Sequence, residues 1–129
     1  MLTSVRLRLH ELWTGSWLPE RVLKRQEFPQ IPDGVFIFSS DKKVAVEVEN
    51  SIKHRARLLA LLERWRRVNV KLVLYVATSD FLFSHLKRCL ADGPRTVPLA
   101  LIHYQNLLAP NPVVWTRTGE VEVFMQKEY

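Results

Sequence analysis

Cysteine, glycine and long apolar stretches are scarce in this sequence, and each scarcity excludes a class of protein. Cys89 is the single cysteine of the 129 residues, which rules out an internal disulfide framework and a cysteine zinc cluster. The four histidines are scattered and form no ligand pair at helical spacing. Apolar runs such as residues 72–77 fall far short of the roughly 20 residues that a membrane-spanning helix needs.

Two further features are missing from the sequence. Charged residues such as Arg6, Arg8 and Glu11 interrupt any apolar core of a signal peptide, so we expect a cytoplasmic location. There is no Gly-rich phosphate loop among the four glycines. We therefore expect neither an organic small-molecule cofactor nor a membrane partner.

Positive charge is what the sequence has in excess. Lysine and arginine number 19 against 13 aspartates and glutamates, which gives a net charge of +6. A field of this sign favours polyanions, nucleic acid first and an anionic membrane second. Apolar residues make up 47% and charged residues 25%, the usual balance of a globular protein. The length fits a single domain covering residues 1–129.

The hydrophobic periodicity predicts helices that alternate with strands. After a strand pair, strands and helices alternate, and this order predicts an α/β fold with a mixed β-sheet flanked by helices. Residues 16–21 are interpreted as a turn, and Asn50-Ser51 as the cap of a long helix. The expected helices are 3–13, 19–25, 52–68 and 79–91, and the expected strands are 35–38, 44–49, 70–77, 97–103, 113–116 and 120–125.

Three acidic residues stand out. Asp33 comes just before a strand, and Glu47 and Glu49 alternate along the next one, on the same face as Ala45. The valines at 44, 46 and 48 share the other face, which must be core. The two glutamates would then lie roughly 7 Å apart, and a divalent cation would remove their repulsion. We expect Asp33, Glu47 and Glu49 to converge on Mg²⁺ or Mn²⁺. The alternative is that both glutamates form the solvent face of an edge strand.

The helix predicted over 52–68 carries a stripe of positive charge. At about 100° per residue, Lys53, Arg57, Arg64 and Arg67 fall within an arc of about 80°, roughly opposite the leucines. A metal site beside a basic stripe suits a substrate with a phosphate backbone. The alternative is a solvated helix face without a ligand.

These residues form a pattern that resembles a known superfamily. Pro32-Asp33-Gly34, a strand and turn, and then Glu47-Val48-Glu49 before a helix resemble the PD-(D/E)xK restriction-endonuclease-like superfamily, which includes archaeal Holliday junction resolvases of similar size. The resemblance implies that Asp33 and Glu47 hold magnesium and that a lysine orients or activates the attacking water. The resemblance also implies a homodimer. Glu20, on the early helix, matches the position of a further acidic residue in many members of the superfamily. Glu49 stands where the motif has lysine, so Lys53 is the candidate for the migrated cation.

A narrower resemblance covers most of the chain. Segments 17–21, 31–34, 44–55 and 73–76 are similar to the nuclease-like part of the plasmid "replication-relaxation" proteins. Together these patterns predict a metal-dependent DNA endonuclease of plasmid replication, mobilisation or recombination. The alternative is an inactive nucleic-acid-binding or assembly protein that retains the fold. The candidate catalytic residues are Asp33, Glu47, Glu49, Lys53 and Glu20, and the candidate DNA-binding residues are Lys53, Arg55, Arg57, Arg64 and Arg67.

Overall fold

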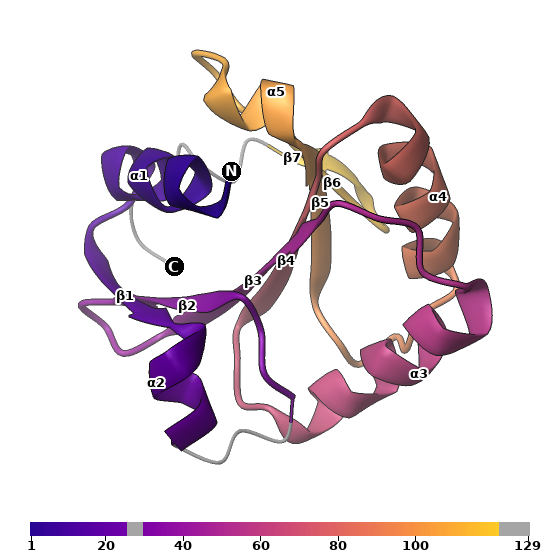
Figure 1. The fold of residues 1–129 in the computed structure, drawn as a ribbon, viewed down its shortest axis with the longest axis horizontal. Helices are drawn as coiled ribbons and strands as arrows, with labels where there is room; N and C mark the ends of the chain where they lie inside the picture. Colours follow the sequence, from indigo (N-terminus) through magenta and orange to yellow (C-terminus); the bar gives the residue numbers. More distant parts are fainter. Residues whose placement is uncertain (26–29, 122–129) are drawn as a thin grey trace.

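The fold is a seven-stranded mixed sheet with helices on both faces (Figure 1). It is seen in a computed structural model that describes residues 1–25 and 30–121. Each strand pairs with the next one along the chain, so the order across the sheet is β1 to β7. The α/β class and the helix-flanked mixed sheet predicted from the sequence are thus confirmed.

The strands change direction twice across the sheet. β1 to β3 are antiparallel neighbours, β3 to β5 run parallel, and β5 to β7 are again antiparallel. The parallel connections pass through helices, as parallel pairing requires. The strands are β1 (Gly15–Pro19), β2 (Gly34–Phe38), β3 (Lys43–Glu49), β4 (Leu72–Ala77), β5 (Leu99–His103), β6 (Val114–Thr116) and β7 (Gly119–Val121).

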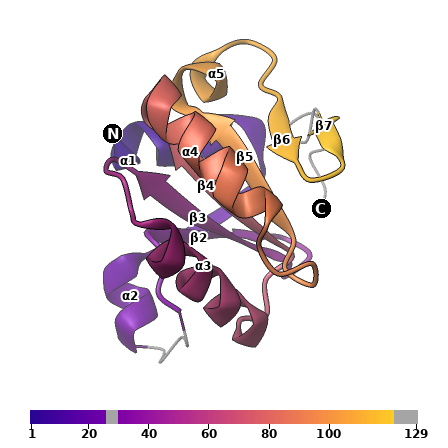
Figure 2. The same cartoon turned by 90° about the vertical axis from the view of Figure 1, so that its right-hand side faces the viewer.

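The helices form two layers around the sheet. Helices α1 (Leu2–Leu12) and α5 (Tyr104–Leu108) lie on one face, and α3 (Arg55–Arg64) and α4 (Asp80–Ala91) lie on the other (Figures 1 and 2). A 3-10 turn, Trp65–Arg67, extends α3. The short α2 (Glu20–Arg25) packs on β1. None of the described helices has the length and apolar character to span a membrane.

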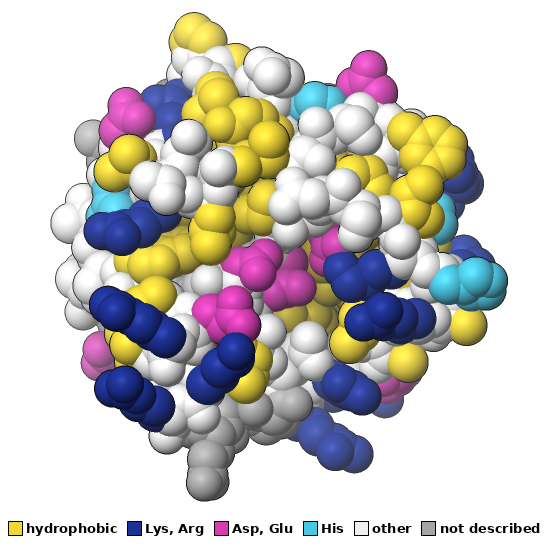
Figure 3. All heavy atoms as spheres, viewed as in Figure 1, with side chains coloured by type: hydrophobic (Ala, Val, Ile, Leu, Met, Phe, Trp, Pro, Cys, Tyr) yellow, Lys and Arg dark blue, Asp and Glu magenta, His cyan; other side chains and the backbone are white. Residues whose placement is uncertain are grey.

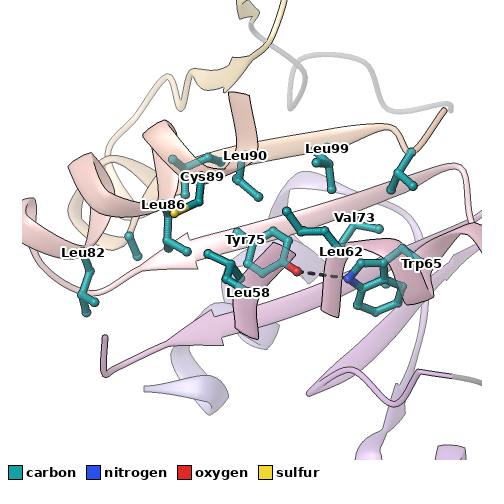
Figure 4. Packing of buried hydrophobic residues seen from close by; sticks show 14 of the residues in the cluster. Leu58, Leu62, Trp65, Val73, Tyr75, Leu82, Leu86, Cys89, Leu90 and Leu99 are labelled. Carbon is teal, nitrogen blue, oxygen red and sulfur yellow. Dashed lines mark hydrogen bonds between the residues drawn. The ribbon is translucent and has the colours of Figure 1, made fainter. Parts of the chain in front are cut away.

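Both faces of the central strands are buried, because helices cover the two sides. Val44 and Val46 of β3 belong to the cluster under α1 and α5, which confirms the predicted core face. Ala45 and Tyr75 belong to the second cluster, under α3 and α4. There the indole N–H of Trp65 donates to the Tyr75 hydroxyl over 3.0 Å (Figure 4). The acidic residues of β3 therefore belong to a strand whose two faces are both shielded from water.

Two elements differ from the sequence-based prediction because long-range contacts decide them. Residues 15–19 form β1 instead of a turn, and Gly15 lies so close to β2 that an added Cβ would be 2.1 Å from the Ile37 carbonyl oxygen. Helix α5 was not predicted; His103 caps it by accepting a hydrogen bond from the Gln105 amide. Of the strand predicted over 120–125, only residues 120 and 121 lie in the described part, within β7.

The long helix predicted from residue 52 begins at Arg55 instead. Neither Asn50 nor Ser51 caps it, and the N-cap residue is His54. Ile52, the predicted first residue of that helix, is 57% exposed. The segment before α3 is held in a non-helical path because His85 of α4 donates from Nε2 to the Lys53 carbonyl over 2.9 Å.

Candidate functional site

The acidic site begins with Asp33, immediately before β2. The Asp33 amide donates to the Val46 carbonyl over 3.1 Å and to Glu47 Oε1 over 3.0 Å. Its own Oδ2 accepts from the Val48 amide over 2.7 Å. The last β2–β3 pair joins Gly34 to Val46, so Val48 lies beyond the end of the ladder. The Asp33 side chain thus takes the place of a strand partner there, and this fixes its carboxylate beside that of Glu47.

Glu47 lies in β3 opposite Tyr75 of β4, and its carboxyl group is half-buried. Burial first, and then the charges of Asp33 and Glu49, raise the pKa of Glu47 to about 8. The amide of Asp33 and the ammonium of Lys53 act in the opposite direction and are too weak to compensate. Without a bound cation, Glu47 is therefore largely protonated near neutral pH. A nearby cation would favour its charged form.

Asp33 experiences the same environment less strongly. Burial is the main cause that raises its pKa, and the charges of Glu20 and Glu49 add to it. The Val48 amide and the charge of Lys53 lower the pKa. The pKa values of both Asp33 and Glu47 are therefore raised, so each carboxyl group favours its protonated form.

Glu49 is the last residue of β3, and its side chain is almost completely shielded from water. It is 4% exposed, and its Oε2 forms an ion pair with Lys53 Nζ. The Glu49 carbonyl accepts hydrogen bonds from the amide and the hydroxyl of Thr78, at 3.3 and 3.1 Å, which ties the end of β3 to the end of β4. Glu49 is thus a buried anchor for Lys53, in contrast to the solvent-facing role that was the alternative.

The sequence predicted Lys53 on the long helix that begins at residue 52, and this is wrong, because Lys53 lies in the loop before α3. Its side chain is 25% exposed, and its charge lowers the pKa of both Asp33 and Glu47. The structure therefore places one ammonium group close to all three acids.

Glu20 is also brought to the site. It begins α2, pairs with Lys24 over 3.1 Å, and its charge raises the pKa of Asp33. Glu20 and Asp33 line the same surface groove. The acidic side chains gather near the middle of one face of the molecule, with Lys and Arg side chains on both sides (Figure 3).

The predicted basic stripe is only partly regular. Arg57 and Arg64 are exposed on α3, two turns apart and hence on one side of the helix. Arg67 is exposed in the 3-10 turn, and Lys53 lies outside the helix. Arg55 is engaged with Asp92, at 2.6 Å.

Sequence reasoning missed a second basic group. Arg6 of α1 and Arg21 and Lys24 of α2 line the groove that reaches Asp33, together with Trp17 of β1. Local pattern does not relate these residues, because it predicts a turn over 16–21 where the structure has β1 paired with β2. The spacing of Arg21 and Lys24 beside Glu20 was the one local signal.

A metal ion fits this donor set in one way. Across residues 1–25 and 30–121, no three His, Cys, Asp or Glu side chains are arranged to hold an ion by themselves. Glu49 forms an ion pair with Lys53, whereas Asp33 and Glu47 are joined by a hydrogen bond, so these two are the candidate ligands. Mg²⁺ commonly binds through one or two carboxylates, keeps several waters and completes its shell with substrate phosphates. Two half-buried oxygen donors with raised pKa values suit that mode.

Comparisons of the chain with protein-family models, with curated proteins and with solved structures find no match. The class to which the protein can be assigned is therefore that of its fold, an α/β protein with a mixed, helix-flanked sheet.

Proposed function

We propose that this chain is a metal-dependent DNA endonuclease of the restriction-endonuclease-like type, which acts on the phosphodiester backbone in plasmid replication, mobilisation or recombination. The observation that carries the proposal is the hydrogen-bonded pair of Asp33, just before β2, and Glu47, near the end of β3, with Lys53 beside it. The resemblance of the Pro-Asp-Gly and Glu-Val-Glu segments to the PD-(D/E)xK motif supports it.

Each residue has a role that follows from its surroundings. Asp33 and Glu47 would hold one divalent cation, Mg²⁺ or Mn²⁺, which supplies charge neutralisation at the phosphate and a lower pKa for water. Glu49 holds Lys53, whose ammonium can donate to a phosphate oxygen or orient a water. Arg57 and Arg64 present their charge to the flanking backbone.

A second candidate function is nucleic-acid binding without cleavage. The Glu49–Lys53 ion pair favours it, because the ammonium that would assist the reaction is already engaged by a buried carboxylate. The charge distribution would serve both functions equally.

A cleavage assay tests the proposal on labelled linear, nicked and branched DNA with Mg²⁺ or Mn²⁺. We expect wild-type cleavage and a loss of about 100-fold or more in Glu47→Gln, since electrostatic contacts at the reacting group have this size. Glu63→Gln is the matched control, because Glu63 is exposed and pairs only with Arg66 among the described residues. Binding without cleavage in the wild type would favour the second candidate. Unchanged cleavage in Glu47→Gln would contradict the assignment of the site.

A further inference from the structure

A surface groove of about 470 Å³ leads away from the acidic pair on the side opposite to α3. It is formed by the start of α1, the end of β1 and the α2 helix, and it ends at Asp33. Its walls combine three cations with an aromatic ring and two carboxylates, those of Glu20 and Asp33. The basic and aromatic lining residues are Arg6, Arg21, Lys24 and Trp17, and Glu20 pairs with Lys24.

Two of the three cations of the groove, Arg6 and Arg21, are available for a ligand. Arg6 and Arg21 are exposed, and neither forms an ion pair with any other residue in the described part of the chain. Lys24 is paired with Glu20. Two free guanidinium groups along a groove are suited to phosphates, which they bind through paired N–H donors.

Trp17 gives the groove an aromatic wall next to the acidic site. Its indole lies directly on Gly34, since an added Cβ there would be 1.9 Å from Trp17 Cζ2. Gly34 follows Asp33 in the chain, so the ring is held beside the carboxylate by the backbone of the site itself. The ring is only partly buried.

Cations thus flank the acidic pair on two sides, as Figure 3 shows for the face that carries the acids. On the α3 side the arginines stand on an open helix face. On the α2 side they line a groove with an aromatic wall, and its volume is that of a small-ligand pocket, too small for a duplex. Positive grooves with aromatic platforms are the usual sites for single-stranded nucleic acid.

We propose that this groove binds a single strand of nucleic acid, with phosphates on Arg6 and Arg21 and a base against Trp17. The inference rests on the proposed function and deepens it. The substrate is then a nucleic acid with a single-stranded segment next to the phosphate at Asp33 and Glu47, and the duplex part lies along α3. An acidic peptide is the competing ligand for the same charges.

Fluorescence anisotropy tests the groove without divalent ions, so that binding is separated from cleavage. The probes are a labelled single strand of about ten nucleotides, within the usual site size, and the duplex of the same sequence. The variant is Arg6→Ala with Arg21→Ala, and the matched control is Arg88→Ala with Arg95→Ala, which removes two exposed charges on the side of α4. A charge-retaining variant, Arg6→Lys with Arg21→Lys, separates loss of charge from loss of structure, and thermal melts verify that folding is intact.

For the single strand, we expect the slope of log K against log salt to fall by about 1.4 in the alanine variant, at about 0.7 per lost phosphate contact. We expect less than half of that change on the duplex and in the control variant, and near wild-type slopes in the charge-retaining variant. An equal loss on the duplex, an equal loss in the control, or displacement of the strand by an oligoglutamate peptide as effective as unlabelled strand would overturn the proposal.

The groove and the nuclease activity fail in distinguishable ways. Unchanged single-strand binding in the alanine variant, with wild-type cleavage that depends on Glu47, would overturn the groove alone. A wild-type protein that neither binds a single strand nor cleaves any DNA would overturn both proposals.

Discussion

At the scale of single residues, Glu47 is a group whose charge state near neutral pH depends on folding. Its pKa is 4.5 in an unstructured chain and about 8 in the folded protein, chiefly through burial. The protonated form is thus favoured by folding. Its contribution to stability is fully present below pH 4.5 and is lost as the pH rises through about 8.

We expect Glu47→Gln to remove this pH dependence in the absence of divalent ions, because glutamine mimics the protonated acid. The free energy of unfolding from urea titrations should fall with pH in the wild type and stay flatter in the variant. Above pH 8 the variant should be more stable by at least about 1 kcal/mol, roughly the value of one pKa unit. Glu63→Gln serves as the control, and parallel profiles for wild type and Glu47→Gln would contradict the assigned environment.

Gly34 is the second residue on which the site depends. Because a Cβ at this position would lie 1.9 Å from Trp17 Cζ2, we expect Gly34→Ala to lower the free energy of unfolding by about 1–3 kcal/mol, the usual cost of overpacking. In a Trp17→Leu background the cost should fall to less than half. Urea unfolding of the four proteins measures this coupling, and an equal cost in both backgrounds would show that the contact is unimportant.

At the scale of elements, the start of α3 determines what the basic residues can do. Thr78 ties the end of β3 to the end of β4, and His85 holds the carbonyl of Lys53, so the chain leaves β3 as a loop. The Lys53 side chain can then turn back to Glu49. The arginines of α3 form a separate surface, whose role can be tested without disturbing the acidic pair.

We expect Arg57→Ala combined with Arg64→Ala to flatten the slope of log K against log salt on duplex DNA by about 1.8, at about 0.9 per lost phosphate contact. Fold stability should change by less than about 0.5 kcal/mol, because both side chains are exposed. Anisotropy titrations at several salt concentrations measure the slope, with Arg88→Ala and Arg95→Ala as the control. An unchanged slope would show that this face of α3 is only solvated.

At the scale of the whole molecule, the sheet has two outer strands, β1 and β7. Outer strands offer backbone groups to a second chain. Part of the C-terminal strand predicted over 120–125, a candidate edge for pairing, lies outside the described residues.

We expect a homodimer, as the resemblance to nucleases that address two strands implies. Light scattering at micromolar concentration should give about 30 kDa, twice the chain mass of 15.1 kDa. A value near 15 kDa would refute the dimer and would leave a single acidic site per particle.

Local sequence pattern determined the central part of this protein. The alternation along 44–49 predicted which residues of β3 share a face, because side chains of a strand point to opposite faces in turn. That helices bury both of these faces was decided by the tertiary structure. The strand β4, from its apolar run, and the helix α4 were predicted for similarly local reasons. The juxtaposition of Asp33 with Glu47 also followed from the hairpin that joins β2 to β3, since a short turn brings neighbouring strands together.

Only the tertiary structure decided the rest of the site. β1 exists because β2 offers it a partner, and this contact spans residues that local periodicity cannot relate. Long-range contacts also decided which of the three acids are paired. Asp33 is bonded to Glu47, whereas Glu49 is buried against Lys53, because α4 and β4 fix the loop that joins Glu49 to Lys53. The groove with Arg6, Arg21 and Trp17 combines three elements, so no single stretch of sequence contains it.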